Sequence, residues 1–207
     1  MRQYSQLGLQ IAQLSKLANV CGLPSRDSIS VEVRSLIFSA DVAKRSLNRE
    51  ELKQVCSCCK SSESAVSVLM NASISLVDRA RHHLVQDQPH LFCPGGQLYP
   101  EYRAQACWRD CEQFLRVIIY GLACACPDIT DKAGMRALLN LYQLLDVPVS
   151  ALLHVLSVMR TLAMQHLNMA GYGKESLLLS LAFDDLIRAL QPIDVESELQ
   201  TGQAQAL

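Results

Sequence analysis

The sequence predicts an all-α domain of about seven or eight helices, with a globin-like arrangement rather than an up-and-down bundle. Half of the 207 residues are apolar, with Leu and Ala prominent, and only 5% are aromatic, which favours helices over a β-sandwich. Apolar residues recur at helical spacing along most of the chain, and no useful stretch alternates as a strand does. A chain of this length can bury a substantial core as one domain.

Residues 1–28 are predicted to form an amphipathic helical extension. Apolar residues from Tyr4 to Cys21 follow one another in steps of three and four, and Gly22 and Pro24 end this pattern. Such a short heptad pattern is marginal alone, so the helix needs a surface to pack on. That surface is either its own domain or a partner protein, and the sequence leaves both open. The composition is also faintly similar to that of a transit peptide.

Local signals mark the helices of the domain, which we place at residues 29–192, before a frayed tail at 193–207. Asp27 and Ser28 can cap the first of these helices, and Asn48 opens a capping box at the start of the second. Turn residues and prolines separate the later ones. The predicted helices are 29–44, 49–60, 64–86, 100–125, 132–145, 148–169 and 174–190.

Composition excludes several classes of protein. The net charge of −1 provides no basic field for nucleic acid. The longest apolar run, 117–126, is far shorter than the roughly 18 residues of a membrane span. Nine cysteines, an odd number, without a signal peptide, argue for a reducing compartment rather than a disulfide framework. The cysteines at 56–59 and 124–126 lack the spacing of a zinc site, so no metal is predicted and buried thiols are the simpler interpretation.

One stretch gathers reactive and charged groups at the start of a long helix. After the turn at 94–96, Arg103, Cys107 and Asp110 fall at i, i+4 and i+7, which places them on one helix face. Arg109 lies about 200° round the helix from Cys107 and reaches the same ligand only by curling back. Taken alone, the cluster is also explained by a buried cysteine among solvated charges.

Several motifs in order resemble the phycobiliproteins, the light-harvesting subunits of the phycobilisome. The strongest is Pro-Gly-Gly at 94–96 followed by Ala-Cys-Trp-Arg-Asp at 106–110 and Phe-Leu-Arg at 114–116. Ser-Ala-Asp-Val at 39–42 and Leu-Asp-Val-Pro at 145–148 add to it. The resemblance runs from about Ile29 to Gln191 and is greatest to β-type allophycocyanin subunits, including the terminal β-like core subunit.

The resemblance implies a globin-like fold and a covalent linear tetrapyrrole, usually phycocyanobilin, with one bilin per chain. Cys107 would form the thioether, and Asp110 would accept hydrogen bonds from the central pyrrole N–H groups. Arg109 and Arg103 would pair with the propionates. The site would bind and rigidify a pigment rather than catalyse a reaction, so an enzyme is not expected.

The resemblance also implies an assembly. Two leading helices would dock an α-type allophycocyanin subunit, giving a heterodimer and then a trimeric ring that binds core linker proteins. Asp41 and Arg116 match positions that form an ion pair between subunits. The assembly would lie on the cytoplasmic face of the thylakoid membrane, in a cyanobacterium or a red-algal-type plastid.

Departures from the family pattern leave alternatives. Gln97, Tyr102, Gln113 and Phe114 replace typical residues, and we expect them around the pigment pocket. Cys-Ala-Cys at 124–126 also departs from the pattern, and we expect it around the pigment pocket too. A pigment-poor paralogue that acts in phycobilisome assembly is therefore the alternative function. A haem-binding globin-like sensor is disfavoured, because neither histidine of the 148–169 helix stands out as an axial ligand.

Overall fold

The computed structural model describes residues 2–191 and confirms the all-α, globin-like fold. Within this range the chain has eight α-helices, two short 3-10 helices and no β-strand. The helices are α1 (Arg2–Leu17), η1 (Leu23–Ser25), α2 (Val31–Val42), α3 (Arg49–Cys59), α4 (Glu63–Asp87), η2 (Pro89–Phe92), α5 (Glu101–Ala123), α6 (Lys132–Leu144), α7 (Val149–Met169) and α8 (Gly173–Leu190). The predicted tail at 193–207 lies outside the described residues.

Side-chain caps start four of the described α-helices, α2, α3, α4 and α6. The Asn48 side chain accepts a hydrogen bond from the Glu51 amide at 2.9 Å, and the Glu51 side chain accepts one from the Asn48 amide, which confirms the capping box. The Asp131 side chain accepts a hydrogen bond from the Gly134 amide at the start of α6, without a reciprocal bond. The prediction for α2 was wrong by two residues, because Ser30 rather than Asp27 or Ser28 supplies the capping oxygen.

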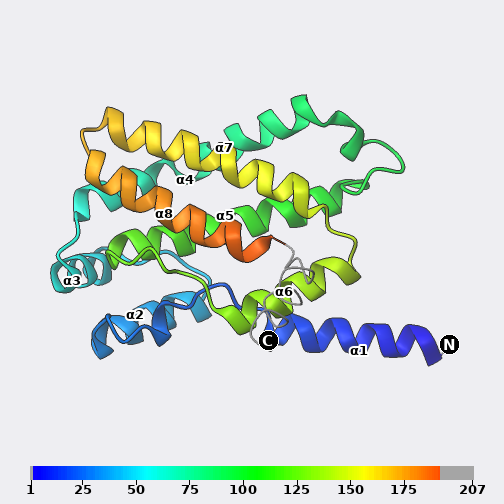
Figure 1. Cartoon of the computed structure of the whole chain (residues 1–207), viewed down its shortest axis with the longest axis horizontal. Helices are drawn as coiled ribbons and strands as arrows, with labels where there is room; N and C mark the ends of the chain where they lie inside the picture. Colours follow the sequence, from blue (N-terminus) through cyan, green and yellow to red (C-terminus); the bar gives the residue numbers. More distant parts are fainter. Residues whose placement is uncertain (1, 192–207) are drawn as a thin grey trace, which may run out of the picture.

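Helices α4, α5, α7 and α8 pack side by side and form the main body (Figure 1). The second half of α5 is the centre of the core, since every residue from Phe114 to Ala123 is buried. A helix segment that is buried on all sides is expected to be largely apolar. This segment overlaps the longest apolar run of the sequence, 117–126. The first half of α5 is more polar, and it carries the candidate site.

Helices α2 and α3 lie together at one end of the body (Figure 1). Helix α2 leaves an apolar face uncovered. On α2, Val31, Phe38 and Val42 are between 59% and 66% exposed, although the opposite face of the helix is buried in the core. Adjacent large apolar side chains in water are a usual sign of a protein-binding surface. The predicted docking role of the two leading helices therefore has a suitable surface.

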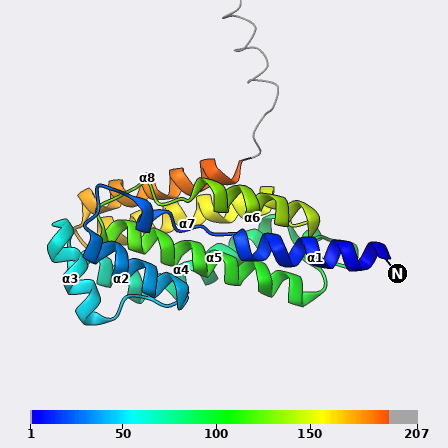
Figure 2. The same ribbon diagram turned by 90° about the horizontal axis from the view of Figure 1, so that it is seen from below.

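The N-terminal extension packs on its own domain. Helix α1 lies along α6, and the chain after α1 follows the segment before α6 in antiparallel direction (Figure 2). The Gly22 amide donates to the Ile129 carbonyl at 2.7 Å, and the Asp131 amide donates to the Val20 carbonyl at 2.9 Å. Leu23 is fully buried. These residues therefore pack on their own domain, which is one of the two surfaces that the sequence left open for the extension.

Helix α1 itself is mostly exposed. Leu9 and Leu17 are 63% and 64% exposed, and only Ile11 and Leu14 of the described side chains are half-buried within the helix. Along residues 2–191, no helix combines the length and apolarity that a membrane crossing requires. The same residues contain no cluster of three or more His, Cys, Asp or Glu side chains suited to a metal ion.

Candidate functional site

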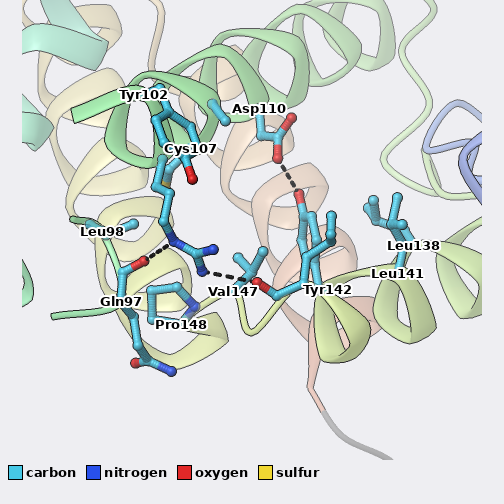
Figure 3. Close-up of a pocket in the computed structure, with 13 residues that line it drawn as sticks. Gln97, Leu98, Tyr102, Cys107, Asp110, Leu138, Leu141, Tyr142, Val147 and Pro148 are labelled. Atoms are coloured by element: carbon cyan, nitrogen blue, oxygen red, sulfur yellow. Dashed lines mark hydrogen bonds between the residues drawn. The ribbon is translucent and has the colours of Figure 1, made fainter. Parts of the chain in front are cut away.

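A cavity of about 350 Å³ opens between the first half of α5 and the second half of α6 (Figure 3). The turn before α5 and the short link between α6 and α7 complete its lining. Its size falls within the usual range of ligand sites, about 300–1,000 Å³. The cavity is lined by Gln97, Leu98, Tyr102, Arg103, Ala106, Cys107, Asp110, Leu138, Leu141, Tyr142, Leu145, Val147 and Pro148.

Cys107 presents the thiol of this cavity. The residue is only 5% exposed, and it lies one helical turn before Asp110 on the same face of α5. A second thiol, that of Cys111, contacts it from the following turn and is fully buried. Interaction with the Cys107 thiol, together with burial, holds the pKa of Cys111 well above its usual range. Cys111 therefore stays protonated, and Cys107 is the thiol that a ligand can reach.

Asp110 and Tyr142 face one another across the cavity (Figure 3). The Tyr142 hydroxyl donates to the Asp110 carboxylate at 2.7 Å. Burial raises the pKa of the Asp110 carboxyl, while Tyr142 and the neighbouring Arg109 partly offset the shift. Burial and the nearby Asp110 charge likewise hold the pKa of Tyr142 well above its usual range. A desolvated carboxylate of this kind gains more than an exposed one from N–H donors on a ligand.

Arg103 lines the cavity but is already engaged with the backbone. Its Nε donates to the Gln97 carbonyl at 2.6 Å, and its Nη2 donates to the carbonyls of Leu145 and Asp146 at 2.9 and 2.8 Å. The Gln97 side chain also binds the Asp146 carboxylate at 2.9 Å. Arg103 thus joins the turn before α5 to the link between α6 and α7 on one side of the cavity, and Nη1 remains as its donor toward a ligand.

Arg109 lies outside the cavity. Its side chain is exposed, as its position about 200° from Cys107 on the helix predicts. In the described structure it acts on the site only through its charge, which lowers the pKa of Asp110. The structure therefore brings together three of the four predicted ligand-binding residues, Arg103, Cys107 and Asp110, and leaves the fourth on the surface.

Asp41 and Arg116 form a pair within one chain, whereas the resemblance implied a pair between subunits. Arg116 Nη2 lies 2.8 Å from Asp41 Oδ1, and each residue is only 8% exposed. Arg116 also donates to the Tyr120 hydroxyl at 2.7 Å and to the Gln113 side chain at 3.0 Å. Contact of either residue with a partner subunit stays a prediction, and such a contact would have to join or replace this pair.

The residues that depart from the family pattern lie in different parts of the structure. Gln97 and Tyr102 line the cavity, as expected. The expectation for Gln113 and Phe114 was wrong, because Phe114 packs in the core and Gln113 binds Arg116. Residues 124–126 line a different cavity. The changes that bear directly on this site are thus confined to the turn before α5 and its first helical turn.

Sequence reasoning missed the α6 side of the site. Tyr142 appeared only as one of the apolar-face residues of a predicted helix, and nothing in its local sequence marks it as the partner of Asp110. Leu138 and Leu141 complete this wall. Their helical spacing predicts a buried face, but it does not tell which residues of α5 that face meets.

The lining suits a linear tetrapyrrole. A reachable thiol provides a covalent anchor, a buried carboxylate can accept hydrogen bonds from ring N–H groups, and a guanidinium can pair with a propionate. Aliphatic and aromatic side chains on α6 offer a flat apolar wall. The residues present therefore fit the group that the resemblance implies.

Comparison with known proteins gives a consistent result. Residues 35–190 match the protein family described as "Phycobilisome protein". The phycobiliprotein beta chain of Mastigocladus laminosus is 29% identical over 167 residues, covering 79% of this chain and 98% of that protein. Allophycocyanin subunit beta-18 of a Nostoc species is 28% identical, with 79% and 98% covered. The allophycocyanin alpha chain of Arthrospira platensis is 27% identical, with 78% and 99% covered.

Proposed function

Because this chain belongs to the phycobilisome protein family, we propose that it is a light-harvesting subunit that carries a linear tetrapyrrole on Cys107. The observation that carries the proposal is the meeting of the Cys107 thiol and the Asp110 carboxylate in one cavity, from one face of α5. When bound, the tetrapyrrole absorbs visible light and passes the excitation on. The chain's own residues would hold and orient the pigment, and we therefore propose that the protein is not an enzyme.

Each residue of the cavity has a separate task in this proposal. Cys107 anchors the pigment through a thioether, and Asp110 accepts hydrogen bonds from its ring nitrogens. Tyr142 keeps the Asp110 carboxylate pointing into the cavity through the bond of 2.7 Å. Arg103 pairs with a propionate through Nη1 while its other nitrogens hold the walls. Arg109 contributes charge from outside and reaches a propionate only at the mouth of the cavity.

The finer details of the proposal follow from the relatives. Two of them are named allophycocyanin chains, one β-like and one α, which supports assembly of different subunits of this family. We propose one phycocyanobilin per chain, an α-type allophycocyanin subunit as partner, and a trimeric ring of such heterodimers with core linker proteins. The exposed apolar face of α2 supplies the contact surface. The assembly would lie at the cytoplasmic face of the thylakoid.

Covalent pigment on Cys107 is the direct test. The full chain is co-expressed with bilin-synthesis enzymes and a bilin lyase, and pigment is detected on a denaturing gel by zinc-enhanced fluorescence. We expect a fluorescent band that disappears in Cys107→Ala. Cys93→Ala is the matched control, because Cys93 is an exposed thiol in the turn before α5 and should leave the band unchanged.

Two outcomes would contradict the proposal. A fluorescent band that survives Cys107→Ala would place the pigment elsewhere. A chain that takes no covalent pigment with any lyase, yet still binds an α-type subunit, would favour the pigment-poor assembly protein.

A further inference from the structure

A second cavity, of about 510 Å³, lies where α3 and α5 end. It shares no lining residue with the first cavity. Four cysteines line it: Cys58 and Cys59 at the end of α3, and Cys124 and Cys126 after α5. Cys59 is half-buried, Cys58 is exposed, and the other two are buried. The proposed pigment site uses none of these thiols.

A hydrogen bond from a side chain to the backbone holds the two chain segments together at this point. The Ser61 hydroxyl donates to the Ala123 carbonyl at 2.5 Å, which joins the residue two after Cys59 to the residue just before Cys124. Lys60 and Ala125, the residues that follow the two cysteines, both have left-handed backbone conformations, with φ of 56° and 49°. Non-glycine residues seldom adopt this conformation, so both turns are specified by their surroundings.

The thiols of Cys59 and Cys124 both line this cavity, and each affects the pKa of the other. Interaction with the Cys124 thiol lowers the pKa of Cys59 to about 7, and the same interaction, together with burial, raises the pKa of Cys124. One sulfur therefore carries negative charge near neutral pH while its neighbour keeps its proton. A half-exposed thiolate beside a second thiol is the arrangement found at redox-active cysteine pairs.

We propose that Cys59 and Cys124 form a redox-active dithiol that a low-molecular-weight disulfide, such as oxidised glutathione, converts to a disulfide. The Cys59 thiolate attacks one sulfur of the oxidant and releases a glutathione thiolate, which gives a mixed disulfide. Cys124 then loses its proton to solvent and attacks Cys59 Sγ, and the second glutathione thiolate leaves. The two protein thiols lose two electrons and two protons in total, and one oxidised glutathione becomes two reduced ones.

The disulfide would tie α3 to the end of α5. Because α3 packs on α2, which carries the uncovered apolar face, the bond would fix the helix that supports that surface. The pair therefore couples the redox state of the thiol pool to the rigidity of this end of the molecule. This inference concerns the unpigmented chain and stands independently of the proposed function.

The test counts thiols in the purified full chain. After incubation with oxidised glutathione at neutral pH, we expect the number of free thiols in denaturant to fall from nine to seven. Peptide mapping without reductant should find Cys59 joined to Cys124. Cys59→Ser should keep all eight of its remaining thiols, whereas Cys58→Ser, the matched control one residue away, should fall from eight to six.

A second measurement keeps the test valid if a variant folds poorly. Alkylation of Cys59 in the wild-type chain, followed by mass spectrometry as a function of pH, should have its midpoint near 7, as its pKa predicts. Nine thiols retained after oxidation, a stable glutathione adduct on Cys59, or a bond from Cys58 to Cys126 would each overturn the proposal.

Discussion

The Tyr142 hydroxyl of α6 donates a hydrogen bond of 2.7 Å to the Asp110 carboxylate of α5, across the cavity that also holds the Cys107 thiol. Tyr142 is buried and Asp110 is half-buried. The Asp110 charge raises the pKa of Tyr142, whereas the hydrogen bond from Tyr142 lowers the pKa of Asp110 and partly offsets the effect of burial. The contact joins the helix that carries the reactive side chains to the helix that forms the facing wall. It therefore sets both the direction of the carboxylate and the width of the cavity.

Removing the hydroxyl should weaken the apoprotein. Tyr142→Phe leaves the ring in place but removes the donor, and a hydrogen bond to a charged group contributes about 1.5–3 kcal/mol. We expect the free energy of unfolding in urea at pH 7 to fall by roughly that amount. Tyr102→Phe is the control, because Tyr102 lines the same cavity but is 67% exposed. An equal decrease in the free energy of unfolding in both variants would show that the bond between Tyr142 and Asp110 does not stabilise the fold.

Asp110→Asn should change how stability depends on pH. Burial raises the pKa of the folded-state carboxyl above 3.8, so the folded chain binds more protons than the unfolded chain between the two values. The contribution of Asp110 to wild-type stability should therefore decrease as pH rises through this window, and the Asn variant should lack this contribution. Urea unfolding from pH 3 to pH 7 should show the variant gaining on the wild type as pH rises. A difference that is constant with pH would contradict this assignment.

Substitutions of Asp41 and Arg116, the buried ion pair between α2 and α5, should have strongly non-additive effects on the free energy of unfolding. Arg116→Met alone leaves the Asp41 carboxylate buried without its main partner, which typically costs about 3–5 kcal/mol. Adding Asp41→Leu removes the orphaned charge, and most of the loss should be recovered. Arg34→Met is the exposed control, since its pair with Asp27 lies in solvent and contributes about 0–1 kcal/mol. A double variant as unstable as the single one would rule out the charge explanation.

The N-terminal extension should detach when Gly134 gains a side chain. A Cβ at Gly134 would overlap the Asn19 carbonyl, which is backbone and cannot move aside cheaply. Gly134→Ala should lose about 1–3 kcal/mol of stability and should speed tryptic cleavage after Lys16 or Arg26. Gly8→Ala has open space around it and should leave cleavage unchanged, with a slight gain in helix stability. Cleavage at wild-type rate in Gly134→Ala would contradict the docked arrangement.

The two arginines near Cys107 should differ in their effect on pigment. Arg103→Gln removes three bonds to backbone carbonyls at the cavity walls, so pigmented chains should show a shifted absorption band and a lower occupancy. Arg109→Gln should change the spectrum little, because that side chain is exposed outside the cavity. Absorption spectra of the co-expressed variants check this. The reverse order would place the propionates on the Arg109 side.

Local signals in the sequence were sufficient for the elements but not for their contacts. The Asn48 capping box depends on residues three apart, so its prediction needed no tertiary information. The common face of Cys107 and Asp110 likewise follows from helical spacing alone. Tyr142 was missed because its role depends on how α6 packs on α5. The bonds from Arg103 to the link after α6 were missed for the same reason.

The thiol pair shows the same limit. Two entire long helices, α4 and α5, separate Cys59 from Cys124 in the chain. The spacing of the cysteines argued against a zinc site but did not indicate that these two would meet. Their meeting results from the packing of α3 on α5 and from the bond between Ser61 and Ala123. Helical spacing predicts which residues close in sequence share a helix face. It does not predict a contact between residues on different helices, which depends on how the helices pack.

The antiparallel contact between residues 20–22 and 129–131 also determines an order of events during synthesis. The ribosome makes the extension first, but the carbonyl and amide groups that receive it emerge only after α5 has been completed. Until then the Val20 carbonyl and the Gly22 amide lack these partners, and Cys21 is without the segment that buries it. The N-terminal segment therefore folds late although it is made early, and the nascent chain exposes an apolar segment that a chaperone or an early partner could bind.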